Sequence, residues 1–112
     1  MAYDEALASR VRKVLEKRRH VAEQRMFGGI AFLLHGNMFC GVLERELVLR
    51  LGEEGVAQAL REPYTRPMDF TGKPMKTMIY LESKGVESDD RLREWIDRAL
   101  LFARLLPRKE RP

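Results

Sequence analysis

The sequence lacks several features that would place it in a specialised class of protein. It contains a single cysteine, Cys40, so a disulfide within the chain is excluded. No apolar run approaches the roughly 20 residues that a membrane-spanning helix requires. The first 19 residues place acidic side chains before basic ones and have no apolar core, unlike a secretory signal peptide. We therefore expect a cytoplasmic protein that does not interact with membranes.

The middle of the chain also has almost no net charge. The net charge is +4, and residues 1–19 carry six bases against three acids. Residues 107–112 carry three bases against one acid, whereas residues 20–106 hold 12 bases and 13 acids. Because the basic character belongs to the two ends, a nucleic-acid-binding function would have to use them.

The size of the chain indicates one domain. A sequence of 112 residues that is 45% hydrophobic can bury a single core without disulfides or metal. We expect residues 1–106 to form this domain and residues 107–112 to be a frayed basic tail.

Helices are expected at both ends of the domain. From about residue 3 to residue 19, apolar side chains recur at helical spacing, with acids in the first turn and bases in the last. A short helix, "EEGVAQALRE", should end at Pro63. Ser88 is the expected N-cap of the closing helix, whose inner stripe is Leu92, Trp95, Ile96, Ala99, Ala103 and Leu106.

Short strands fill the middle of the chain. "VAEQRMF", "IAFLL", "MFCGVLE", "LVLRL" and "MKTMIYLE" read as strands, and "HGN" reads as a hairpin turn. "PYTRPMDFTGKP" has three prolines in 12 residues and is expected to be a loop. The order α-β-β-β-β-α-β-α predicts an α+β fold with two layers, an antiparallel sheet of about five strands and three helices.

Several residue groups could bind a ligand. Gly28 and Gly29 lead into a strand rather than a helix, so a bend or bulge is favoured over a phosphate-binding turn. A candidate anion loop combines Arg66, Lys73 and Lys76 around a glycine.

The first helix offers candidate nucleic-acid contacts. Its bases lie on both flanks of the apolar stripe, which is typical of an ordinary solvated face and less so of a phosphate-binding ridge. The candidates for such contacts are Arg12, Lys13, Lys17 and Arg19.

No group of residues predicts catalysis. Cys40 has apolar neighbours, which favour a buried thiol over a reactive one. His20, His35 and Cys40 are too few for a recognisable zinc site, and no carboxylate pair indicates acid–base chemistry. We expect a non-enzymatic protein without a cofactor, metal or catalytic residues.

Apolar surface is in excess of what one small domain needs. Two strands are apolar at nearly every position, so they are either covered on both faces or in contact with a partner. Leu101 and Leu105 fall on the outer face of the closing helix. These features favour a homodimer or another protein partner, with Leu101 and Leu105 as the candidate surface.

Four stretches resemble the TfoX/Sxy N-terminal-domain family in order and spacing. They are "RMFGGIAFLLHGNMFCGV", "LVLRL", "RPMDFTGKPMKTMIYL" and "SDDRLREWIDRALLFARLLP". The signature after a basic residue is Met26, Phe27, Gly28 and Gly29, and "GKPM" at residues 72–75 is similar to the short stand-alone branch without the helical C-terminal domain. The resemblance implies a small antiparallel α+β domain and a regulatory role, because the family is named for competence regulators that act in transcription beside another activator. It implies no catalytic residue.

Overall fold

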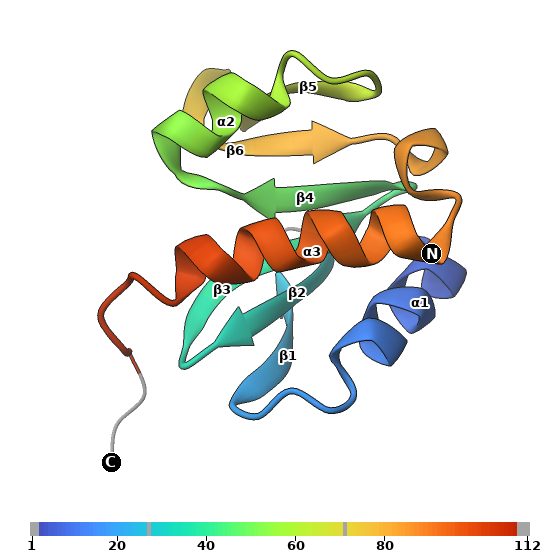
Figure 1. The fold of residues 1–112 in the computed structure, drawn as a ribbon, viewed down its shortest axis with the longest axis vertical. Helices are drawn as coiled ribbons and strands as arrows, with labels where there is room; N and C mark the ends of the chain where they lie inside the picture. Colours follow the sequence, from blue (N-terminus) through green and yellow to red (C-terminus); the bar gives the residue numbers. More distant parts are fainter. Residues whose placement is uncertain (1–2, 27, 71, 110–112) are drawn as a thin grey trace.

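Figure 1 shows the computed structural model of the chain, which describes residues 3–26, 28–70 and 72–109. Over these residues, three α-helices and six strands form one α+β domain. In chain order they are α1 (Glu5–Leu15), β1 (Val21–Met26), β2 (Gly29–Leu34), β3 (Asn37–Leu43), β4 (Glu46–Arg50), α2 (Gly52–Ala59), β5 (Thr65–Phe70), β6 (Lys73–Leu81), the 3₁₀ turn η1 (Ser83–Val86) and α3 (Asp89–Ala103).

The strands form one antiparallel sheet in the order β1-β2-β3-β4-β6-β5. Helix α3 crosses β3 and β4, α1 packs beside it, and α2 packs against β6 (Figure 1). The predicted fold class and element order are thereby confirmed. None of the described helices combines the length and apolar character that crossing a bilayer requires.

The sixth strand, β5, comes from the proline-rich segment that was expected to be a loop. This strand lies at the edge of the sheet and pairs only with β6, with Pro67 opposite Ile79. Proline has no backbone N–H to donate, but an edge strand needs donors on one side only. The prolines therefore mark an edge strand rather than the absence of a strand.

Helix α1 is shorter than the apolar periodicity predicts, because it ends at Leu15 instead of near residue 19. The Arg18 N–H donates to the Leu15 carbonyl at 2.9 Å, and His20 adopts a left-handed φ of 66° before β1 begins. The cations at residues 17–19 therefore lie in the connection between α1 and β1.

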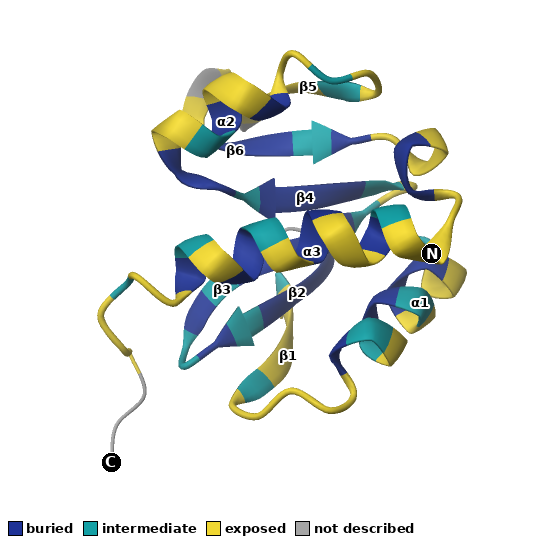
Figure 2. Ribbon diagram, in the orientation of Figure 1, coloured by how far each residue is buried: buried dark blue, intermediate teal, exposed yellow. Residues whose placement is uncertain are grey.

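Both faces of the central strands are covered by the chain itself. The main core lies between the helices and the sheet, where the facing elements are buried (Figure 2). Its largest buried side chains are Trp95, Phe32 and Phe39. On the opposite face, Val48, Met68 and Met78 form a second buried cluster. The apolar strands are thus explained within one molecule, and the outer face of α3 is left as the candidate partner surface.

Residues 107 and 109 are hydrogen bonded to the turn between β2 and β3. The Asn37 side-chain amide donates to the Pro107 carbonyl at 2.8 Å, and the Lys109 N–H donates to the His35 carbonyl at 2.9 Å. This part of the expected tail is therefore held on the domain, whereas residues 110–112 lie outside the described residues.

Candidate functional site

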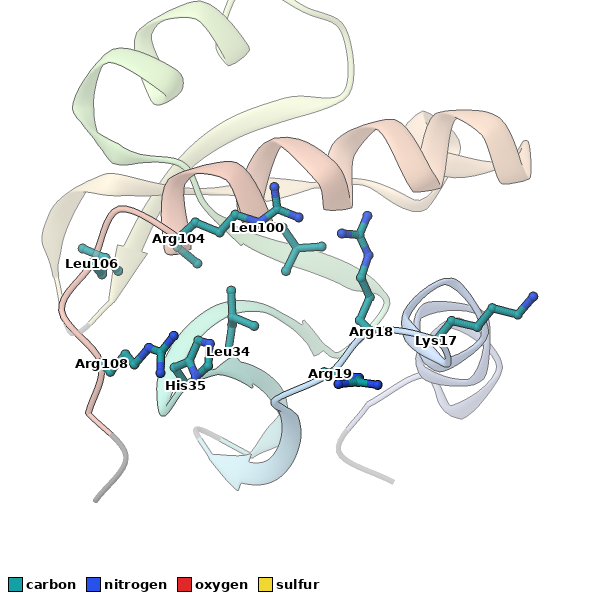
Figure 3. Close-up of a pocket in the computed structure, with 10 residues that line it drawn as sticks. Lys17, Arg18, Arg19, Leu34, His35, Leu100, Arg104, Leu106 and Arg108 are labelled. Carbon is teal, nitrogen blue, oxygen red and sulfur yellow. The ribbon is translucent and has the colours of Figure 1, made fainter. Parts of the chain in front are cut away.

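A basic pocket forms where the two basic ends of the chain meet. The cavity has a volume of about 430 Å³ and lies beside the end of α1, the end of α3 and the β2–β3 turn (Figure 3). Its lining includes His35 and the apolar side chains of Leu34, Leu100, Ala103 and Leu106. The charged residues among the described lining are all cations, namely Lys17, Arg18, Arg19, Arg104 and Arg108.

Hydrogen bonds hold the three segments of the pocket together. The His35 N–H donates to the His20 carbonyl at 3.0 Å, and the two imidazole rings stack with their centroids 4.4 Å apart. Asn37, at 2% exposure, binds the C-terminal segment as described above. The cations on residues 17–19 and on residues 104–108 are therefore presented on a connected framework.

The charge of the pocket is largely uncompensated. Arg18 pairs with Asp97 at 2.9 Å, whereas no ion pair within the described residues involves Lys17, Arg19, Arg104 or Arg108. The C-terminal ends of α1 and α3 contribute roughly half a negative elementary charge each. These dipoles offset about one cation, so the pocket remains strongly positive.

Of the four predicted nucleic-acid contacts, two line the basic pocket and two lie outside it. Lys17 and Arg19 line the pocket, although Figure 3 shows the Lys17 side chain extending away from the others. Arg12 instead binds Glu5 at 2.7 Å and Glu23 at 2.9 Å. Hydrogen bonds from Glu23 and Glu5 raise the pKa of the Arg12 guanidinium. Lys13 is exposed on α1 and does not line the pocket.

Two functional candidates, Arg18 and Arg104, were not identified from the sequence. They are far apart along the chain, and Arg104 looked like an ordinary residue at the end of a helix. The basic composition of both ends was the available signal, but only the fold shows that these ends adjoin.

The candidate anion loop is not assembled as a cluster of free cations. Both guanidinium nitrogens of Arg66 bind Glu46, and this guanidinium stacks on the Tyr80 ring with its central carbon 4.4 Å from the centroid. The hydrogen bond to Glu46 raises the pKa of Arg66. Lys76 is exposed, and the side chain of Lys73 lies outside the described part of the structure.

The glycine signature forms a corner between two strands. Met26 ends β1, Gly28 has a left-handed φ of 75°, and Gly29 begins β2, while Phe27 lies outside the described residues. A Cβ on Gly29 would lie 2.2 Å from the Val42 carbonyl oxygen. The requirement for glycine here comes from backbone packing.

Cys40 lies in the main core. It is fully buried, and burial raises the pKa of its thiol. Among residues 3–26, 28–70 and 72–109, no three His, Cys, Asp or Glu side chains group together as a metal site needs.

The outer face of α3 carries the two leucines that were predicted to be exposed. Leu101 is 63% exposed and Leu105 is 80% exposed. They border a cleft of about 460 Å³ between α2 and α3, where Phe102 packs against Gly52. This cleft and the two leucines are called the α3 surface below.

The fold and these exposed groups define a small antiparallel α+β domain with a basic pocket and an apolar helix face. The model of the TfoX N-terminal domain matches residues 13–103, so the chain belongs to this family. The resemblance read from the four sequence stretches is thereby confirmed. No curated protein sequence matches the chain. Arg104 and Arg108 lie beyond the matched residues, whereas the cations at residues 17–19 lie within them.

Proposed function

We propose that this TfoX-like domain is a non-enzymatic regulatory module that acts by binding proteins, and that it forms a homodimer through the α3 surface. The observation that carries the proposal is the exposure of Leu101 and Leu105 on α3. The inner face of this helix is buried (Figure 2). Adjacent apolar side chains of this size are typical of a contact surface. A role in transcription, as the resemblance to competence regulators implies, is part of the same proposal.

Two side chains that could perform chemistry, Cys40 and Glu62, are occupied in packing or ion pairs, which is in keeping with a binding function. Cys40 is buried, and a reactive thiol needs exposure and a lowered pKa. Glu62 is held by Arg98 at 2.7 Å and by Arg91 at 3.5 Å. These groups stabilise the domain.

A two-fold contact suits the shape of the α3 surface. In such a contact each copy presents the same patch, so Leu101 and Leu105 of one copy can enter the α2–α3 cleft of the other. Glu53 and Glu54 on the α2 wall and Arg98 on the α3 wall also border this cleft. Carboxylates of one copy can therefore face Arg98 of the other copy, which already binds Glu62 of its own chain, at the rim.

The expected affinity is modest. Burying the exposed parts of four leucines contributes roughly 6 kcal/mol, whereas association costs about 4–15 kcal/mol. Even with further contributions from Phe102 and the polar rim, the balance is small, so we expect a weak dimer that forms only at high protein concentration.

Light scattering after size exclusion, over a range of concentrations, tests this proposal. The molecular mass should rise from 13.1 kDa toward twice that value as the concentration increases. The double variant Leu101→Glu/Leu105→Glu should stay monomeric, because two carboxylates from each copy would be buried in the contact.

Leu60→Glu/Met75→Glu is the matched control. Both residues are exposed apolar side chains away from the α3 surface, and the change in charge is the same. This variant should associate like the original chain. A chain that stays monomeric at every concentration, or two variants with equal behaviour, would contradict the homodimer.

A further inference from the structure

We propose that the basic pocket binds closely spaced phosphate groups carried on a nucleoside. The source is either a free nucleotide or the phosphorylated end of a single nucleic-acid strand, since both present the same chemistry. This site is separate from the α3 surface and adds a ligand to the proposed protein-binding function.

The first argument is the charge of the pocket. The lining supplies five cations, of which Arg18 is paired with Asp97. Lys17 extends away from the other cations, so after the two helix dipoles are counted the residual charge is roughly +2. A nucleoside di- or triphosphate carries a comparable negative charge in a compact chain, whereas a single carboxylate would neutralise only a fraction of it.

The second argument is the chemistry of the cations. Four of the five cationic side chains that line the described pocket are arginines. A guanidinium donates two parallel hydrogen bonds to a phosphate and is more weakly hydrated than an ammonium group, so it binds phosphate with a defined geometry. Figure 3 shows Arg18, Arg104 and Arg108 on different sides of the cavity, from which they can bind successive phosphates.

The third argument is the shape and lining of the pocket. A volume of about 430 Å³ is in the range of small-molecule sites. Leu34, Leu100 and Leu106 give it an apolar part. An inorganic anion would not use these groups, whereas a base and ribose can pack on them. The cations also surround a hollow instead of following a stripe, which favours a nucleotide or strand end over a duplex.

The fourth argument is the rigidity of the framework. The two hydrogen bonds that hold residues 107 and 109, together with the His35–His20 hydrogen bond, connect the segments before any ligand arrives. Like charges held together in this way repel one another, and a polyanion relieves that repulsion. Ligand binding should therefore raise the melting temperature.

Calorimetry and thermal unfolding, with ATP, ADP, AMP, adenosine and pyrophosphate as probes, test the site. A short single-stranded oligonucleotide is measured with and without a 5′-phosphate to distinguish the two sources. We expect affinity to fall from ATP to ADP to AMP, adenosine not to bind, and pyrophosphate to bind more weakly than ADP. The affinity should also fall as salt is added.

Charge variants assign the binding to the pocket. Arg19→Glu/Arg108→Glu changes two exposed side chains and should weaken ATP or oligonucleotide binding at least tenfold, which is about 1.4 kcal/mol. Arg45→Glu/Arg93→Glu makes the same change in charge at exposed residues outside the pocket lining and should have a much smaller effect. Circular dichroism checks that both variants are folded.

A variant that is expected to bind the ligand more tightly shows that misfolding is not the reason for altered binding. Asp97→Asn frees Arg18 from its ion pair, so we expect binding to tighten about threefold. Binding by the oligonucleotide alone, lost in the pocket variant, would support a strand end as the source. No binding by any probe would overturn the proposal. So would equal losses in the pocket and control variants, or pyrophosphate binding as tight as ADP binding.

The phosphate site and the homodimer can fail independently. Leu101→Glu/Leu105→Glu should abolish association and leave ATP or oligonucleotide binding within about twofold, because neither leucine lines the basic pocket. Loss of ligand binding in this variant would contradict the separation of the two sites.

Discussion

The close approach of β2 and β3 at Gly29 leads to a sharp prediction about stability. In Gly29→Ala, the new Cβ would lie 2.2 Å from the Val42 carbonyl oxygen and 3.3 Å from the Leu43 Cα atom. Both are backbone atoms, so no side-chain rotation can relieve the contact. In Gly28→Ala, by contrast, no atom lies within 4 Å, and the only strain comes from the left-handed φ of 75°.

Gly29→Ala should lower the free energy of unfolding more than Gly28→Ala, because a backbone clash is more destabilising than a left-handed φ alone. Restoring ordinary contact at Gly29 requires the strands to separate by roughly 1 Å, which weakens adjacent inter-strand hydrogen bonds worth about 1 kcal/mol each. Overpacking strain adds about 1–3 kcal/mol, so we expect Gly29→Ala to lower the free energy of unfolding by about 3 kcal/mol. For Gly28→Ala, the cost of about 1–2 kcal/mol for left-handed backbone is partly offset in the unfolded state, which leaves about 1 kcal/mol.

Urea unfolding followed by circular dichroism measures this difference. With a denaturant slope of about 1.5 kcal/mol per molar, the midpoint should fall by about 2 M in Gly29→Ala and by less than about 1 M in Gly28→Ala. Gly28→Asn should be milder still, because asparagine tolerates left-handed φ. Equal midpoints for the two alanine variants, or a lower one for Gly28→Ala, would refute the steric explanation.

Two other buried groups, the Trp95 indole and the Cys40 thiol, lead to predictions about stability. The Trp95 indole N–H is buried without a hydrogen-bond partner among the described residues. Trp95→Phe should therefore lower the free energy of unfolding by at most about 1 kcal/mol, whereas Leu92→Ala should lower it by about 3 kcal/mol. Equal losses of stability in urea unfolding would contradict this expectation. Burial raises the pKa of the Cys40 thiol, so the unfolded chain loses this proton at a lower pH than the folded one. Stability should therefore fall above about pH 8.5, by up to about 1.4 kcal/mol per pH unit from this group, and a decline between pH 7 and 10 that is equally steep in Cys40→Ala would exclude this cause.

Local patterns predicted the closing helix well. Its apolar stripe is buried from Leu92 to Ala103, whereas Leu106 lies beyond the end of the helix and is half-buried. The Ser88 hydroxyl accepts a hydrogen bond from the Arg91 N–H at 3.1 Å, as expected of an N-cap. Both features depend on residues within a few turns of one another. The edge strand β5 was missed because its pairing with β6, and not its own composition, decides its structure.

The candidate site was less predictable because its residues meet only through the tertiary fold. The sequence showed that both ends are basic, but not that Arg104 and Arg108 would lie beside residues 17–19. It also could not show that Arg12 would be bound by Glu23 from the next strand. Left-handed backbone at His20 and His35, where two non-glycine residues place their rings together, was equally hidden from periodicity.

The family signature and the basic pocket lie at opposite ends of β2. Gly29 begins this strand and Leu34, which lines the pocket, ends it, so about 17 Å of extended chain separates them. The glycine is required by the approach of β3, and that requirement would hold whatever the pocket binds. Arg104 and Arg108 also fall outside the residues that match the family model. Gly29 thus serves the packing of the sheet, whereas the proposed ligand binding depends on cations at the ends of the chain. Substitutions at Gly29 should accordingly change stability, and those at Arg19 and Arg108 should change ligand affinity.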